Sequence, residues 1–197
     1  SIPKKYIKRY SWIKDVNDAG NPFHYYDNII RYLGINSLYA EKNFTQNDIV
    51  TLFTSPNIQN VRIGWGSNPL FSVDKKTNKF IGAPDICVFT LHEDTSNITK
   101  PLQFEVTSNV EKITYALDSI VIRNTKKEHF CCVLTCNKKE KSFDGASVGR
   151  LKDFNWKSKI NENVDWTFEY QGDYDHYSTM RWNFTNCYQL MFYYRIN

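Results

Sequence analysis

Two short apolar runs in the middle of the chain predict a pair of neighbouring strands. The first run is Ile86–Leu91 and the second is Leu102–Thr107, with a polar turn between them. Because successive side chains of a strand point to opposite faces, the second run has one apolar face and one polar face. The polar face carries Gln103, Glu105 and Thr107.

Apolar residues at helical spacing precede this pair. Asn21 and Pro22 suit an N-cap and a first helical position, and Gly34 suits a helix stop, so we expect a helix between them. Residues 46–53 predict a second, shorter helix. Short strands are expected over residues 61–63, 70–73 and 80–81, between turn-rich segments.

The spacing changes after Thr107. Apolar residues then recur near 3.6-residue intervals, which predicts a helix from about 109 to 124. The following run, His129–Cys136, is almost continuously apolar, as is typical of an internal strand buried on both faces. Strand, helix and strand in this order indicate a right-handed crossover. The expected fold class is therefore α/β, with a mixed central β-sheet flanked by helices.

The C-terminal third has a different character. Val164–Tyr170 alternates cleanly and predicts an edge or added strand, whereas Met180–Ile196 is densely aromatic with a period that fits either helix or strand. We interpret residues 1–197 as a single domain. Its core is expected at about 20–136, followed by an aromatic and basic extension over 137–197.

Composition sets outer bounds on function. An apolar fraction of 41% permits a substantial core, and a net charge of +4 permits a nucleic-acid partner without requiring one. No apolar run is long enough to cross a membrane, so no membrane association is expected.

The five cysteines are odd in number and lack paired metal-ligand spacings, which favours reduced, buried thiols in the cytoplasm or nucleus. Asn-x-Ser/Thr sequons at Asn43, Asn97 and Asn183 keep a secreted origin open.

Two carboxylates stand out on the predicted strand pair. Asp85 opens the first strand and Glu105 lies within the second. Carboxylate oxygens are the ligands that Mg²⁺ prefers, and bound metal ions activate water for hydrolysis of phosphodiesters. Acids held on adjacent strands therefore predict a metal site.

These residues resemble the motifs of the PD-(D/E)XK nuclease superfamily, whose fold is restriction-endonuclease-like. Pro84-Asp85 resembles the PD element, and Gln103–Thr107 resembles the Gln-x-(Asp/Glu)-x-Lys element, with Thr107 where the lysine usually stands. The resemblance covers about Glu41 to Cys136, half of the chain.

The resemblance implies a metal-dependent endonuclease acting on DNA in preference to RNA, and it leaves a homodimer open. It implies that Asp85 and Glu105 bind Mg²⁺ or Mn²⁺, with the Val106 carbonyl completing the shell and Gln103 beside it. A third acid is expected from an upstream element. Glu41 is the first candidate, with Asp27 or His24 as the others.

Thr107 departs from the family pattern because it supplies no positive charge. Three explanations stay open. Lys112, on the expected helix, can reach back toward Glu105 and replace the lysine. A polar residue can suffice at this position. Alternatively, the chain is an inactive relative, or another module that binds nucleic acid or protein without catalysis.

The segment after Asn137 supplies a candidate surface for nucleic acid. Lysine and arginine side chains would contact phosphates, and the aromatic residues Phe154 and Trp156 lie among them in the sequence. The alternative is a solubilising loop. The basic residues concerned are Lys138, Lys139, Arg150, Lys152 and Lys157.

Overall fold

A computed structural model describes residues 22–35, 37–41, 73–74, 79–80, 84–92, 99–107, 112–124, 126, 128–145, 151–168 and 180–197. The helix expected over 46–53, the strand expected over 61–63 and the candidate basic residue Arg150 lie outside these residues.

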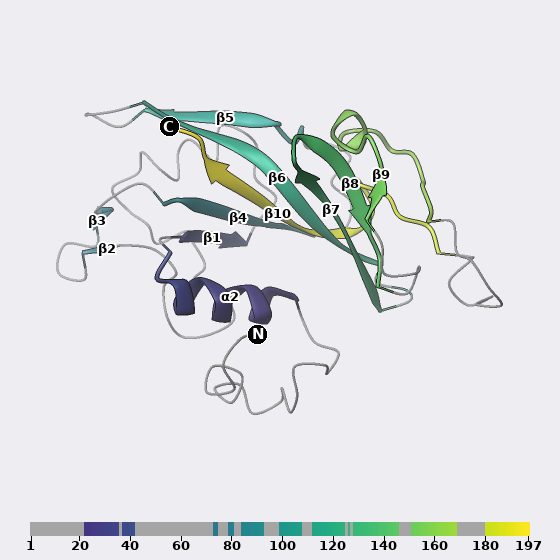
Figure 1. The fold of residues 1–197 in the computed structure, drawn as a ribbon, viewed down its shortest axis with the longest axis horizontal. Helices are drawn as coiled ribbons and strands as arrows, with labels where there is room; N and C mark the ends of the chain where they lie inside the picture. The colour runs from purple at the N-terminus through teal and green to yellow at the C-terminus, as the bar shows by residue number, and fades with distance from the viewer. Residues whose placement is uncertain are drawn as a thin grey trace.

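An eight-stranded sheet forms most of the described structure (Figure 1). Only its first pair is parallel, and all the other pairs are antiparallel. The strand order is β1 (Ser37–Glu41), β4 (Ile86–Leu91), β10 (Tyr188–Arg195), β6 (Lys112–Asn124), β7 (His129–Cys136), β8 (Lys139–Phe143) and β9 (Lys152–Asp153), and β5 (Gln103–Thr107) also pairs with β6.

Four smaller elements complete the secondary structure of the described residues. They are the helix α2 (Pro22–Leu33), the 3₁₀ turn η2 (Lys157–Lys159), and a separate antiparallel pair of β2 (Val73–Asp74) with β3 (Lys79–Phe80). This pair falls where strands were expected around a polar loop.

The expected fold class, a mixed sheet flanked by helices, is wrong. The sheet is largely antiparallel, and the segment expected to be a helix over 109–124 contains the 13-residue strand β6. Without a crossover helix at this point, β6 runs directly into β7 as an antiparallel neighbour.

A β-bulge in β6 explains why its sequence resembles a helix. Leu117 lies opposite Tyr193 of β10, but the next opposed pair is Ser119 with Phe192, so Asp118 is an extra residue. Ile113, Tyr115 and Leu117 are buried before the bulge, and Ile120 and Ile122 after it. Core-facing residues occur at every second position on both sides of the bulge, but the extra residue shifts the second run by one position. Read together, the two runs resemble the 3.6-residue spacing of a helix.

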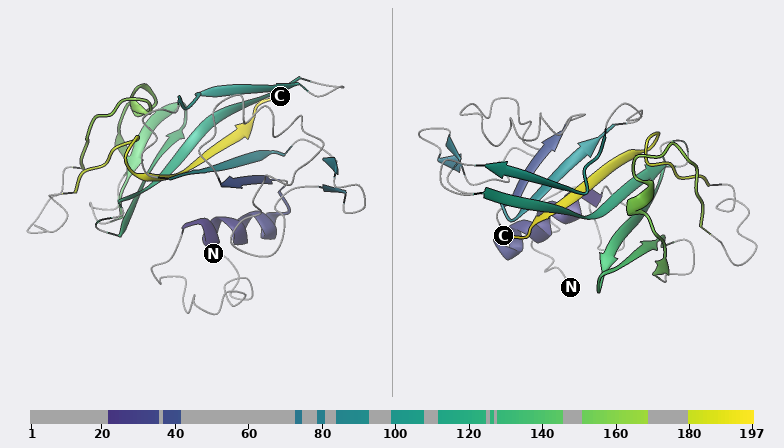
Figure 2. Two further views of the ribbon diagram at one scale, coloured as in Figure 1. Left: turned by 180° about the vertical axis from the view of Figure 1, so that it is seen from behind. Right: turned by 90° about the horizontal axis from the view of Figure 1, so that it is seen from above.

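The sheet also forks along β6. The first half of β6 pairs with β5, through registers such as Glu105 with Thr114, and the second half pairs with β7, from Ser119 opposite Leu134 onward. Asp118 thus lies at the point where the pairing partner changes. The views in Figure 2 show β5 and the β7–β8–β9 part diverging from this central strand.

The helix predicted near the N-terminus is confirmed. α2 begins at Pro22, and Gly34 ends it with a φ of 67°. The Ile35 N–H donates to the Ile30 carbonyl at 3.2 Å, which is the capping bond expected when glycine takes the left-handed conformation.

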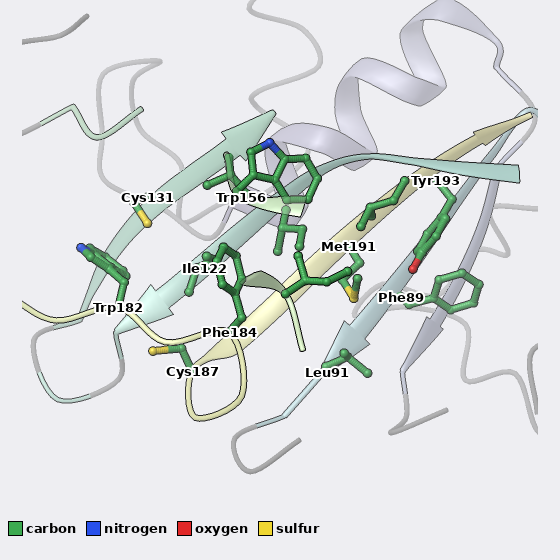
Figure 3. Packing of buried hydrophobic residues seen from close by; sticks show 14 of the residues in the cluster. Phe89, Leu91, Ile122, Cys131, Trp156, Trp182, Phe184, Cys187, Met191 and Tyr193 are labelled. Carbon is green, nitrogen blue, oxygen red and sulfur yellow. The ribbon is translucent and has the colours of Figure 1, made fainter. Parts of the chain in front are cut away.

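The two faces of the sheet are covered differently. On the helix face, defined by Val88, Leu190 and Phe192, the Tyr26 ring of α2 packs edge-on against Phe192 with centroids 5.0 Å apart. On the core face, defined by Phe89, Met191 and Tyr193, the segments 151–168 and 180–187 supply the cover. Figure 3 shows Trp156, Trp182 and Phe184 gathered over these strands.

Two further strand predictions are corrected by this packing. β7 is not buried on both faces, because its burial alternates, with Cys131 and Val133 buried between half-buried neighbours. Val164–Tyr170 was expected to form a strand, but its described part makes a single bridge from Trp166 to Trp182. The C-terminal segment of ambiguous period includes the central strand β10.

The cysteines and one sequon can be assessed directly. All five cysteines are free, and Cys87, Cys131 and Cys187 are buried. Asn183 is 5% exposed, and its side-chain amide donates to Asn163 and Asp165, so this sequon is not accessible for glycosylation in the folded chain. Within the described residues, no helix has the length and apolarity needed to span a bilayer.

Candidate functional site

Asp85 lies just before β4 and is tied to the end of the chain. Its Oδ1 is 3.3 Å from Nη2 of Arg195, and its carbonyl accepts the Arg195 N–H at 2.9 Å. The neighbouring Pro84 carbonyl accepts a 2.7 Å hydrogen bond from the buried Tyr115 hydroxyl. Burial, the largest cause, raises the pKa of Tyr115, which keeps this hydroxyl a donor. Asp85 is thus an exposed carboxylate with a basic neighbour.

Glu105 has a basic neighbour of its own. Its Oε2 is 2.8 Å from Nζ of Lys112, and both side chains are more than half exposed. Lys112 does reach Glu105, although from the antiparallel strand β6 and not from a helix. Gln103 is exposed two residues earlier on the same strand. Thr107 is opposite Lys112 in the register, and Val106 is opposite Ile113; the side chains of Thr107 and Val106 lie outside the described residues.

The structure does not bring Asp85 and Glu105 together. β10 and β6 lie between β4 and β5, so the two backbones are three strand spacings apart, about 14 Å. The two side chains also leave opposite faces. Glu105 alternates with the buried Phe104 and so lies on the helix face, whereas Arg195, the partner of Asp85, follows Tyr193 by two residues on the core face.

The third expected ligand is also distant. Glu41 is opposite Thr90 near the far end of β4, whereas Asp85 precedes its first residue. The side chains of Glu41, Asp27 and His24 lie outside the described residues. Among the described residues, no three His, Cys, Asp or Glu side chains gather as metal ligands. Asp85 and Glu105, on opposite faces and three strands apart, therefore do not share one ion in this arrangement.

Four of the predicted basic residues, the lysines that the structure describes, lie around the β7–β8 hairpin. We call Lys138, Lys139, Lys152, Lys157 and Lys159 the lysine-rich surface. Asn137 and Lys138 form the tight turn with φ values of 50° and 63°, as a two-residue hairpin of this twist requires. Backbone bonds hold the next segment against the hairpin: the N–H of Phe154 donates to the Glu140 carbonyl at 3.1 Å, and that of Lys157 donates to Glu140 Oε2 at 2.9 Å.

The aromatic residues of this segment face inward. Trp156 is fully buried, and its indole N–H donates to the Leu134 carbonyl at 3.2 Å. Phe154 packs against Trp166 with ring centroids 4.7 Å apart. Both rings therefore pack within the protein and are not presented to a partner.

The bulge of β6 borders a hollow that sequence reasoning missed. It measures about 430 Å³ and is lined by Ile86, Asp118, Ser119, Phe192, Tyr193 and Tyr194. We call it the bulge hollow. Burial raises the pKa of Asp118, while a hydrogen bond from Ser119 and the charge of Lys157 act in the opposite direction. The available signal was the Asp-Ser pair at the change of phase between two apolar runs.

Comparison of the chain with protein-family models and with curated proteins finds no match.

Proposed function

We propose that this chain is a nucleic-acid-binding module that contacts phosphates through its lysine-rich surface. One observation carries the proposal: β8, β9 and η2, with the turn before β8, present five lysines around a single hairpin. By register Lys139 and Lys152 leave opposite faces of the sheet, so the lysines surround the hairpin and do not share one face. Lys138 and Lys139 are exposed at its tip, and the other three are half-buried.

Three acidic residues near this surface are engaged within the protein, whereas Glu162, three residues after Lys159, is exposed. Asp144 is buried against His129, with Oδ1 and Nε2 2.8 Å apart. Glu140 accepts the backbone N–H of Lys157, and Asp153 pairs with Lys141, which lowers the pKa of Asp153. These contacts leave the five lysines with a local excess of positive charge, which favours a polyanion as partner.

The expected mode of binding is electrostatic and tolerant of sequence. Phosphate contacts by lysine release condensed counterions, and the affinity then falls steeply with salt. Base reading is not expected, because Phe154 and Trp156 are packed in the core. Double-stranded DNA is the preferred partner because of its high charge density. A reducing compartment, such as the cytoplasm or nucleus, would suit the five free thiols.

Cleavage by a metal shared between Asp85 and Glu105 is not included in the proposal. The two acids occupy different faces, and each already has a basic neighbour within 3.3 Å. Of the alternatives that the missing motif lysine left open, the non-catalytic binding module agrees best with this geometry.

Fluorescence anisotropy with a labelled 20-base-pair duplex tests the proposal. We expect binding whose log affinity falls linearly with log salt, and the double variant Lys138→Glu, Lys139→Glu should reduce that slope by about 2, or about 1 for each lost phosphate contact. Lys126→Glu is the matched control. It makes the same kind of charge change at an exposed position near the opposite end of β7, about 25 Å away.

The control makes half the charge change of the double variant, so a loss in the control half as large as that in the double variant would show that only net charge matters, and the proposed surface would be rejected. A plasmid incubated with Mg²⁺ or Mn²⁺ tests catalysis. Metal-dependent cleavage that disappears in both Asp85→Ala and Glu105→Ala would overturn the non-catalytic assignment.

A further inference from the structure

The bulge hollow combines a carboxylate with aromatic walls. Asp118 stands at its rim because the extra residue of the bulge interrupts the ladder between β6 and β10. Phe192 and Tyr194 line it from β10, and Ile86 lines it from β4. Among the described residues that line it, none is basic.

The carboxylate of Asp118 differs from the other acids near this sheet. Glu105 and Asp85 are more than half exposed, and each contacts a basic side chain. Asp118 is half-buried, and the positive charge of Lys157 acts on it from η2. The Lys157 ammonium lies 5.3 Å from the centre of the Trp156 ring and makes a cation–π contact with it.

We propose that the bulge hollow binds an organic cation, an ammonium or guanidinium group carried on an apolar stem. The charged group would pair with Asp118 and Ser119, while the stem would pack between Phe192, Tyr194 and Ile86. Aromatic faces attract cations, and a partly desolvated carboxylate gains from a charged partner more than an exposed one does. A volume of about 430 Å³ accommodates a lysine- or arginine-sized group.

The proposal of this site does not rest on the proposed nucleic-acid surface, although Lys157 acts on both, and one variant separates the two. Lys157 belongs to the lysine-rich surface and also opposes any cation that approaches Asp118. Lys157→Met should therefore weaken duplex binding and strengthen cation binding, by about threefold each. A duplex effect without a cation effect would reject the cation site alone, and the converse would reject the role of Lys157 in the nucleic-acid surface alone.

Titration of the ¹⁵N-labelled full chain with n-butylammonium and with n-butylguanidinium tests the site. We expect saturable shifts of the amides of Asp118, Ser119 and Tyr194, and 1-butanol, the neutral analogue of n-butylammonium, should bind at least tenfold more weakly. Equal binding of the alcohol would overturn the proposal, because the carboxylate would then have no role. Saturable shifts with cytidine or guanosine and none with the cations would also overturn it.

Three variants sharpen the result. Asp118→Asn should lower cation affinity at least tenfold, whereas the matched control Glu105→Gln, which neutralises an exposed acid on the same face, should leave it unchanged. Tyr194→Ala, at a side chain 45% exposed and therefore safe for folding, should lower it about threefold. Unchanged affinity in both Asp118→Asn and Tyr194→Ala would reject the site.

The cation could come from a side chain of a partner protein or from a small free amine, and short peptides distinguish these two sources. If the natural ligand is a lysine or arginine side chain of a partner protein, Gly-Gly-Lys-Gly-Gly or its arginine counterpart should bind at least as tightly as the free alkyl cation. If it is a small free amine, the peptide should bind more weakly than n-butylammonium. Absence of binding by all four cations would overturn the proposal.

Discussion

Two groups of charged side chains in this protein differ in their exposure to water. One group lies at the end of the sheet that carries the motif residues, and the other lies near the part that loops cover. Asp85 and Glu105 are exposed and lie beside Arg195 and Lys112. Asp118 and Lys100, by contrast, are withdrawn from water to different extents. A charge in water can lie almost anywhere at little cost, so the exposed acids say little about a site. A charge removed from water requires specific compensation, and that makes it informative.

The largest effect is expected from disturbing the phase of β6. Deleting Val121 would place Ile120 beside Ile122, so that one of two fully buried side chains must leave the core face. We expect a loss of at least about 3 kcal/mol in the free energy of unfolding, measured by urea denaturation.

Deletion of Asp118 is the matched comparison for that experiment. It would restore a regular alternation from Leu117 through Ser119 to Ile120, so the core face keeps all its apolar side chains. The loss should stay below about 1 kcal/mol, within the range of ordinary substitutions. Equal losses from the two deletions would contradict the assignment of the bulge to Asp118.

Lys100 should make stability depend on alkaline pH. Its Nζ donates to the Phe184 carbonyl at 2.7 Å, and burial lowers its pKa from 10.5 to about 8. Because the native state binds fewer protons at Lys100 than the unfolded state between these values, the contribution of Lys100 to stability should rise as pH increases from about 8 to 10.5, by at most about 3 kcal/mol. Burial raises the pKa of the Cys87 and Cys131 thiols, which act in the opposite direction above about pH 9 in the wild type and in Lys100→Met alike. Urea titrations of both proteins across this window should therefore show the rise as a pH-dependent difference between them, and a difference that stays constant with pH would contradict the prediction.

A buried pair should show an intermediate effect. The Asp144 side chain is fully buried, and its Oδ1 lies 2.8 Å from His129 Nε2. Asp144→Ala would leave the histidine without this partner and should lower the free energy of unfolding by about 2 kcal/mol. The measurement is thermal or urea denaturation at pH 7. A loss no larger than that of Glu105→Gln would show that burial does not distinguish these acids.

The smallest effects belong to the exposed acids. Asp85→Asn and Glu105→Gln should each change the free energy of unfolding by about 0.5 kcal/mol or less, because solvent screens both ion pairs. Urea denaturation at low and high salt checks this. A loss above about 2 kcal/mol in either variant would mean that the acid has a structural role which its exposure does not indicate.

Several local features were predictable from the sequence. The helix from Pro22 to Gly34, the strands around Ile86–Leu91 and Gln103–Thr107, and the strand His129–Cys136 follow from residue periodicity and capping residues. Such patterns depend only on residues close together in the sequence, which is why the sequence is enough to predict these segments. The same approach failed at β6, where the bulge changes the phase of an alternating pattern and imitates a helix.

The candidate site was less predictable than the fold elements. Lys112 was identified as a residue that reaches Glu105, and the ion pair exists. The lysines of residues 138–159 do gather around one hairpin. The predicted pairing of Asp85 with Glu105 assumed that consecutive strands are neighbours in the sheet. Asp118 was missed because an acid within a supposed helix gave no reason to expect a hollow beside it.

The amino-acid sequence by itself determined which segments alternate, where the first described helix begins and ends, and that a basic segment follows Cys136. Only the tertiary structure decided which strands are neighbours. β10, from the last residues of the chain, inserts between β4 and β6 and separates the two acids of the motif. The physical reason is that strands pair through backbone hydrogen bonds, which are common to all residues, so the choice of partner depends on packing between residues far apart in the sequence.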